Sequence, residues 1–264
     1  MHEKALVDAI LAELPVDDGS RAYFVDMWRG ALGERKTGRG LPKQPLPYVP
    51  ILPEEFGLEL TAESTLLDVG CLSGYGIFDF HTRRTGARRP VPRLVGLDID
   101  PVSVELGRAL ARIWADDTRV TFCLASCESI PHEPGAFNML IARTVLPYVN
   151  IDATLSEFAR VLRPSGLALI QLHAPGYYWW HLARSLRRPV LAGYYARPLM
   201  SRAILGLTGR QPEHRWFQET ALDADELIAL CRRHDLTPVW SQPHRYHPIV
   251  TFRRGASPFR PSSR

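Results

Sequence analysis

The stretch TLLDVGCLSGYG, residues 65–76, constrains the fold of this chain more than any other feature. The run LLDV is short and apolar apart from Asp68, which is typical of a parallel strand that is buried on both faces. Gly70, Gly74 and Gly76 follow at once and allow the backbone of a turn to come close to a ligand. The stretch therefore predicts a strand, a ligand-binding turn and the start of a helix.

A second strand pattern, RLVGLDID, follows and ends in Asp98. In open α/β sheets a carboxylate at the end of this strand accepts hydrogen bonds from ribose hydroxyls. Ile99, the next residue, is assigned to the same site. The ends of these two strands together predict a site for a nucleoside.

Strand and helix patterns alternate beyond this point, as in a doubly wound parallel sheet. Pro101 suits the first turn of a helix, and Gly166 is placed to end the helix that precedes the fifth strand. TPVWSQ and HPIVTF near the end of the chain predict a closing hairpin. The fold class is α/β, with a doubly wound, mostly parallel, seven-stranded (Rossmann-like) sheet. The expected elements before that hairpin are strands 65–70, 93–98, 119–124, 137–142 and 167–173 and helices 74–85, 101–115 and 151–162.

These residues resemble the class I S-adenosylmethionine-dependent methyltransferases, whose first motif looks like DVGCGTG and whose second strand ends in an acid. The resemblance runs from about Thr65 to His173 and continues through FCLASCESIP, FNMLIARTVLPYV and EFARVLRPSGLALIQLH in the family's order. It implies S-adenosyl-L-methionine as the cofactor and a last strand that inserts antiparallel into the sheet. It also implies transfer of an already activated methyl group by in-line displacement.

The resemblance also implies a set of cofactor-binding residues, with Asp68 ordering the glycine turn. Leu72 stands where the family usually has its middle glycine, and Ser126 stands where an acid commonly meets the adenine amino group. These two departures support an alternative, a catalytically silent protein of the same fold that acts as a regulatory or scaffold partner. The assigned cofactor-binding residues are Asp68, Gly70, Leu72, Gly74, Asp98, Ile99, Ser126, Cys127 and Arg143.

The chain divides into five segments along the sequence. An N-terminal helical cap with a proline-rich linker is expected over residues 1–60, and the cofactor-binding core over 61–173. An insertion follows over 174–215, residues 216–254 complete the core sheet, and 255–264 form a flexible tail.

The insertion carries a cluster of aromatic residues interleaved with arginines, and it follows the carboxyl end of a strand. Because ligands of open α/β sheets lie beyond those strand ends, the segment is expected to be a substrate lid. Helices packed only for stability and a membrane-surface helix are the alternatives. The assigned substrate-binding residues are Tyr177, Tyr178, Trp179 and Trp180.

Two residues at strand ends are candidates for catalysis. His173 ends the fifth strand and has the intrinsic pKa of a general base, and Tyr148 follows the fourth strand. The cysteines and acidic residues do not follow a metal-ligand spacing, so no metal is expected and the thiols are expected to be buried and reduced.

Charge and hydropathy limit the kinds of partner that the protein is expected to bind. The net charge of +4 arises from arginines that are scattered rather than clustered, which argues against a nucleic-acid-binding surface. The sequence shows neither an apolar run of about 20 residues nor a signal-peptide pattern, so a cytoplasmic protein without integral membrane association is expected. A homodimer is left open.

The function predicted from these features is methyl transfer from S-adenosylmethionine to a small, largely apolar organic acceptor. Besides the silent protein, a methyltransferase that acts on a lipid at the membrane surface is an alternative. An NAD-dependent oxidoreductase fits poorly, because the glycine spacing GxxxGxG differs from the GxGxxG of dinucleotide-binding turns.

Overall fold

The computed structural model describes residues 53–114, 119–212 and 219–255, together with the isolated positions 9 and 12. The expected N-terminal helices, the proline-rich linker before Pro53 and the tail beyond Gly255 lie outside the described residues. A short 3-10 helix, η1 (Pro53–Phe56), precedes the first strand of the sheet.

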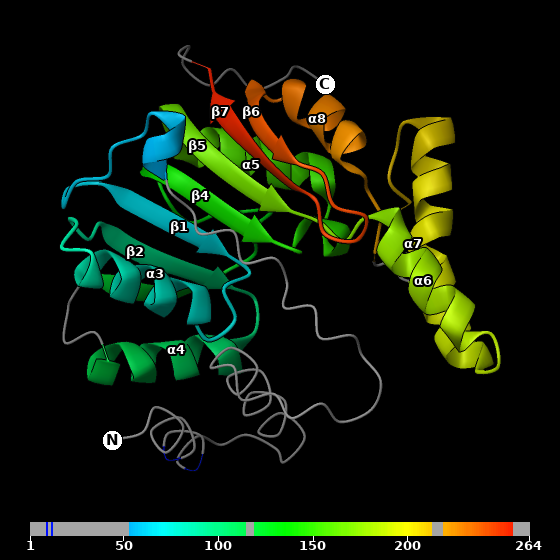
Figure 1. The fold of residues 1–264 in the computed structure, drawn as a ribbon, viewed down its shortest axis with the longest axis horizontal. Coiled ribbons are helices and arrows are strands. Elements are labelled where there is room, and N and C mark those ends of the chain that lie inside the picture. The colour runs from blue at the N-terminus through cyan, green and yellow to red at the C-terminus, as the bar shows by residue number, and fades with distance from the viewer. Residues whose placement is uncertain (1–8, 10–11, 13–52, 115–118, 213–218, 256–264) are drawn as a thin grey trace.

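One seven-stranded sheet forms the centre of the described chain, as predicted (Figure 1). Its order is β3-β2-β1-β4-β5-β7-β6, and β1 to β5 are parallel. β7 lies antiparallel between β5 and β6, which confirms the closing hairpin. The strands are β1 (Thr65–Val69), β2 (Arg93–Asp98), β3 (Val120–Leu124), β4 (Phe137–Arg143), β5 (Leu162–Gln171), β6 (Leu236–Gln242) and β7 (Ile249–Arg254).

Helices follow the strands in the predicted alternation. Pro101 begins its helix, where its missing N–H and fixed φ cost nothing. Asn150 accepts the N–H of Ala153 at the start of the next helix, and Asp223 forms a capping box with Glu226 further on. The helices are α3 (Tyr75–Gly86), α4 (Pro101–Trp114), α5 (Ile151–Val161), α6 (Pro175–Ser185), α7 (Pro189–Thr208) and α8 (Ala224–Arg232), with the 3-10 helix η2 (Leu146–Tyr148) after β4.

Successive residues of the central strands face two separate hydrophobic cores. Leu66 and Met139 pack with residues of α3 and α4, whereas the next residues, Leu67 and Leu140, pack with residues of α5 and α8. This alternation follows from the period of two along a strand. It explains why these strands are apolar at almost every position, as a sheet covered on both faces requires.

The start of β5 differs from the prediction. α5 ends at Val161, and β5 begins directly at Leu162 instead of at residue 167. Gly166 therefore lies inside the strand and does not end a helix. The reason is local: the residue before Pro164 is disfavoured in helical geometry, and Ser165 has a positive φ of 63° in the irregular stretch between Leu162 and Leu167, where the pairing with β4 shifts register.

The ring of Phe122 on β3 accounts for three glycines on neighbouring elements. A Cβ atom added to Gly74, Gly96 or Gly107 would lie 2.4, 2.7 or 2.6 Å from atoms of that ring. These distances are far shorter than a carbon–carbon contact of about 3.5 Å. Gly74, which the sequence assigned to ligand approach, is thus required by internal packing.

Replacing Gly96 tests this packing. Gly96→Ala is expected to lower the free energy of unfolding by about 1–3 kcal/mol, because the new methyl group overpacks the core against Phe122. Gly193→Ala on α7 is the matched control, since a Cβ there meets no atom within 4 Å. Urea denaturation should show the control unchanged or stabilised by up to about 1 kcal/mol. Equal stability of the two variants would contradict the packing argument.

Candidate functional site

The loop after β1 is fastened to the end of β2. Gly70, with φ 63°, donates its N–H to the carbonyl of Leu97 at 2.8 Å. Leu72 has a positive φ of 50° and donates its N–H to Oδ2 of Asp98 at 2.7 Å. Leu72 thus keeps the left-handed conformation that suits a glycine, and its backbone is held by a carboxylate.

Asp98 is buried at the carboxyl edge of the sheet, and its Oδ1 accepts the N–H of Asp100 at 3.0 Å. Each carboxylate oxygen has two lone pairs, so the group can still accept hydrogen bonds from a ligand. Ile99 is 73% exposed and Leu124, at the end of β3, is 49% exposed. Exposed apolar side chains after the ends of β2 and β3 offer surface for the flat ring of a nucleoside.

Asp68 and Arg143 join the ends of β1 and β4. Nη2 of Arg143 lies 3.0 Å from Oδ2 of Asp68. Burial raises the pKa of the Asp68 carboxyl, while the Arg143 charge and hydrogen bond oppose this shift. A Cβ on Gly76 would lie 1.8 Å from the same Nη2, so the glycine in the first turn of α3 makes room for the ion pair.

Two assigned cofactor residues after β3 have other partners. The Ser126 hydroxyl accepts the N–H of Glu128 at 3.1 Å and orders the turn. Cys127 is buried in the core, with its sulfur 3.7 Å from the hydroxyl of Thr154 on α5. Burial also raises the pKa of the Cys127 thiol. Its side chain therefore belongs to the core under α5, so a contact of Cys127 with a cofactor would have to come from its backbone.

α6 and α7 form the insertion, and they extend from the carboxyl end of β5 (Figure 1). At the start of α6, Ala174 donates its N–H to the carbonyl of Tyr246 at 2.9 Å. After α7, Gln211 donates from its side chain to the carbonyl of Val149, also at 2.9 Å. These bonds hold the base of the helical hairpin against the β6–β7 connection on one side and the segment after β4 on the other.

A ladder of ring contacts, two stacked and one tilted, runs from His173 just after β5 into the insertion. The rings of His173 and Tyr177 stack at 4.3 Å between centroids, with 15° between their planes. Tyr177 meets His181 at 4.4 Å, and His181 stacks on Tyr195 of α7 at 4.6 Å. The ladder links a strand end to the space between α6 and α7.

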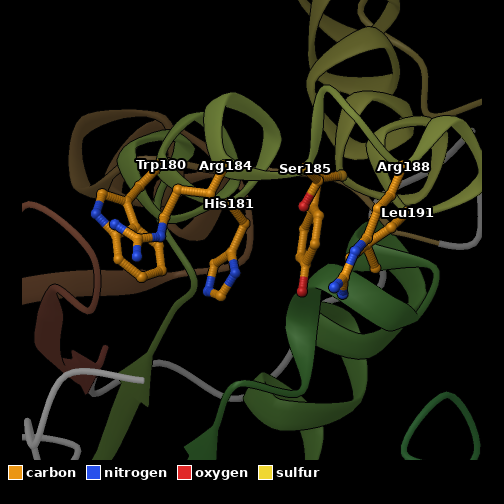
Figure 2. Close-up of a pocket in the computed structure, with 7 residues that line it drawn as sticks. Trp180, His181, Arg184, Ser185, Arg188 and Leu191 are labelled. Atoms are coloured by element: carbon orange, nitrogen blue, oxygen red, sulfur yellow. The ribbon is translucent and has the colours of Figure 1, made fainter. Parts of the chain in front are cut away.

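A pocket of about 260 Å³ lies at the far end of this ladder (Figure 2). Arg184 places its guanidinium 4.7 Å from the centre of the Trp180 ring, a cation–π contact. Of the four assigned substrate residues, Trp180 alone lines this pocket: Tyr178 is buried and Trp179 is 59% exposed. The lining residues are Trp180, His181, Arg184, Ser185, Arg188, Leu191 and Tyr195.

His173 is uncharged at neutral pH. Burial lowers the pKa of its imidazole to about 3, with help from His247 and His181. Burial likewise lowers the pKa of His247 to about 4. Nδ1 of each ring is buried without a hydrogen-bond partner among the described residues. Because a general base works best with a pKa near the operating pH, His173 is poorly matched to the role that the sequence assigned to it.

Glu219 is a polar group of this region that sequence reasoning missed. Its buried Oε1 accepts the hydroxyl of Tyr194 at 2.6 Å, and burial raises the pKa of its carboxyl. The pKa of the Tyr194 phenol is raised by burial, by that hydrogen bond to Glu219 and also by Tyr148. Tyr148 itself is exposed on η2. The three groups place titratable oxygens next to the carboxyl end of β4.

Comparisons with known proteins agree with this architecture. Residues 67–170 match a family model described as a methyltransferase domain. The chain is 33% identical, over 78 residues, to a ubiquinone/menaquinone biosynthesis C-methyltransferase of Geobacter sp. (strain M21). That match covers 29% of this chain and 33% of the relative, so the chain spans about a third of the length of the curated relatives it matches.

Solved structures share the fold at low sequence identity. A putative sarcosine dimethylglycine methyltransferase from Galdieria sulphuraria aligns with a TM-score of 0.57 at 16% identity, over 91% of this chain and 99% of its own. A protein described as a SAM-dependent methyltransferase from Methanosarcina mazei aligns with a TM-score of 0.55 at 16% identity, over 79% and 100%.

The sheet order and the glycine turn fastened to an acid at the end of β2 define an α/β protein with the fold of S-adenosylmethionine-dependent methyltransferases. The family-model match places a methyltransferase domain over residues 67–170, the same part of the chain in which the sequence motifs resemble the class I family.

Two further observations concern the described part of the chain only. None of its helices combines the length and the apolar character that crossing a bilayer needs. Within the same residues, no three histidine, cysteine, aspartate or glutamate side chains are grouped so as to hold a metal ion.

The low pKa of His173 predicts how stability depends on pH. The unfolded chain binds a proton at a pKa near 6.5 and the folded chain only near 3, so stability should fall as the pH drops between these values. His173→Gln should reduce that slope by on the order of 1 kcal/mol per pH unit. Thermal unfolding experiments between pH 7 and pH 4 measure this slope of the free energy of unfolding against pH, with His81→Gln on α3 as the control. An unchanged slope in His173→Gln would count against a buried neutral imidazole.

Proposed function

We propose that the protein transfers a methyl group from S-adenosylmethionine to a small, largely apolar organic acceptor by in-line displacement. The observation that carries the proposal is the aromatic ladder from His173, two residues after β5, to the pocket between α6 and α7. Ligands of open α/β sheets lie beyond the carboxyl ends of the strands, where this ladder begins. The donor residues and the base of the hairpin that carries the pocket would then lie at one edge of the sheet.

The groups at the ends of β1, β2 and β3 fit the donor. Asp98 would accept the ribose hydroxyls, with Ile99 and Leu124 beside the adenine. The loop that contains Leu72 and the Asp68–Arg143 pair would hold the amino-acid end. The bound donor supplies an activated methyl group, so these residues have to bind and orient it and exclude water.

The pocket between α6 and α7 fits an acceptor with a large apolar part. Trp180, Leu191 and Tyr195 supply apolar faces, and Arg184 can bind a carboxylate or phosphate at one end of the molecule. Where the acceptor must lose a proton, Glu219 is the candidate base, because burial raises the pKa of its carboxyl. Tyr148, exposed on η2, is the group that would hydrogen-bond the reacting atom.

Carbon is the first acceptor atom to test, because the curated relatives are named as C-methyltransferases. Calorimetric titration with S-adenosylmethionine comes first, followed by incubation of metabolite extracts with isotope-labelled donor. Binding of the donor with labelling of an apolar product would support the proposal. Absence of binding at millimolar donor would instead favour the catalytically silent protein.

Asp98 tests the donor site. Asp98→Ala should weaken donor binding at least tenfold, because hydrogen bonds to a charged group contribute about 1.5–3 kcal/mol each. Calorimetry measures the Kd, and circular dichroism checks the fold, since Asp98 also holds the Leu72 N–H. Asp225→Ala, an exposed acid on α8, is the control. Unchanged affinity in a folded Asp98→Ala protein would remove the assignment.

The two neighbouring tryptophans of α6 test the acceptor pocket. Trp180→Ala should raise the KM for the acceptor by about 10- to 100-fold, because it removes a ring that lines the pocket. Trp179→Ala should change the KM less than threefold, since Trp179 is exposed and lies outside the lining. Donor affinity should stay constant in both variants. Equal effects of the two substitutions would place the acceptor elsewhere.

A further inference from the structure

The connection between α6 and α7 combines exposed apolar and basic side chains. Leu186 is 70% exposed and Val190 is 88% exposed. Three exposed arginines lie with them, Arg184, Arg187 and Arg188. Residues 184–190 are called the hairpin tip below. In Figure 1 the tip lies at the end of the hairpin that is remote from the sheet.

The part of the insertion that contains α6 and α7 is basic and lacks acidic residues. From residue 174 to residue 211 the sequence contains six arginines and neither aspartate nor glutamate. Arg202, near the base of the hairpin, pairs with Asp223 and Glu226 of α8 at 2.6 and 2.9 Å. The tip arginines, by contrast, form no ion pair within the described ranges, so their charge is free to meet an external anion.

Exposed apolar side chains are concentrated on the same hairpin. Among the described residues, six of the ten large exposed apolar side chains belong to α6, α7 or their connection. Two of the other four, Ile99 and Leu124, lie at the proposed donor site. The six are Trp179, Leu186, Val190, Tyr194, Met200 and Leu207.

We propose that the hairpin tip docks on the surface of an anionic lipid bilayer. Leu186 and Val190 enter the headgroup region, and the tip arginines bind lipid phosphates around them. This pairing of apolar and basic side chains is typical of helices that lie at a bilayer surface without crossing it. Apolar insertion and charge then act on the same partner.

The position of the pocket links the hairpin tip to the proposed function. This link rests on the proposed function, whereas the docking itself does not. Arg184 and Arg188 belong both to the tip and to the pocket lining. Docking would therefore bring the pocket beside the bilayer, where an apolar acceptor accumulates. The acceptor class becomes a molecule that partitions into lipid.

Two other occupants of the tip fit less well. A two-fold contact between copies of the tip would bring its arginines together without an acidic residue of the tip between them. Nucleic acid would attract the arginines, but its phosphate backbone would leave Leu186 and Val190 exposed. An anionic bilayer can bury the apolar side chains and also bind the arginines through its lipid phosphates.

Co-sedimentation with vesicles tests the docking on the full chain without cofactor. One vesicle preparation is phosphatidylcholine with about a third phosphatidylglycerol, and the other is phosphatidylcholine alone. The protein should bind the anionic vesicles, bind the neutral ones at least tenfold more weakly, and lose most binding at high salt. No binding to the anionic vesicles, or equal binding to both, would overturn the proposal.

Paired variants distinguish vesicle binding by the hairpin tip from binding through the overall positive charge of the protein. Arg187→Gln with Arg188→Gln should lower the partition coefficient about 30-fold, and Leu186→Ser with Val190→Ser about tenfold or more. The controls are Arg232→Gln with Arg233→Gln, an exposed pair at the end of α8, and Val239→Ser on β6. Controls that lose as much binding as the tip variants would overturn the docking surface.

Sedimentation velocity of the Leu186→Ser, Val190→Ser protein adds an independent criterion. If the substitutions split a dimer and leave vesicle binding intact, the tip is an interface between copies and the proposal fails. Because vesicle binding is measured without donor or acceptor, its failure leaves methyl transfer standing. Failure of methyl transfer likewise leaves the docking result intact.

Discussion

The hydrogen bond from the Leu72 N–H to Asp98 fixes the geometry on which the rest of the site depends. At 2.7 Å it holds a leucine in the left-handed region, a conformation that costs roughly 1–2 kcal/mol for a residue with a Cβ atom. A buried carboxylate is a strong enough acceptor to offset that cost. The same carboxylate holds the Asp100 N–H, so one side chain sets the position of the loops after β1 and β2. Leucine at this position thus alters the side-chain surface of the turn while leaving its backbone in the shape a glycine would give.

Much of the fold could be predicted from the sequence because the parallel strands are buried on both faces and read as short apolar runs between turn signals. The prediction failed where a local effect competes with that signal. Gly166 resembles a helix end, yet Pro164 makes the chain leave helical geometry earlier, and β5 starts at Leu162. The glycines of the turn were identified from the sequence, but part of the reason why these positions need glycine was not. Gly74 accommodates the ring of Phe122 and Gly76 accommodates Arg143, and these partners lie far away in the sequence.

The candidate site was predictable to the extent that strand ends determine it. Asp68, Asp98 and Arg143 are strand-end residues, and the structure brings the first and the last within an ion pair. The thiol of Cys127 lies in the core beside Thr154, which the sequence of a short turn segment does not encode. No sequence motif pointed to His247 or Glu219. His247 meets His173 only because β7 runs antiparallel beside β5, and the position of Glu219 depends on contacts with Tyr194 across the hairpin.

The attachment of the insertion has a consequence for how such a protein can diversify. The base of the hairpin is tied to the core in part through main-chain carbonyls, those of Tyr246, Val149 and Pro147, which accept hydrogen bonds from Ala174, Gln211 and Thr220. A carbonyl is present whatever side chain the residue carries. Sequence drift in the core therefore leaves these bonds available, and drift in α6 or α7 leaves the loop between β1 and Asp98 untouched. The insertion and the loop that holds Asp98 can therefore evolve at separate rates, so a change of acceptor does not require a new donor site.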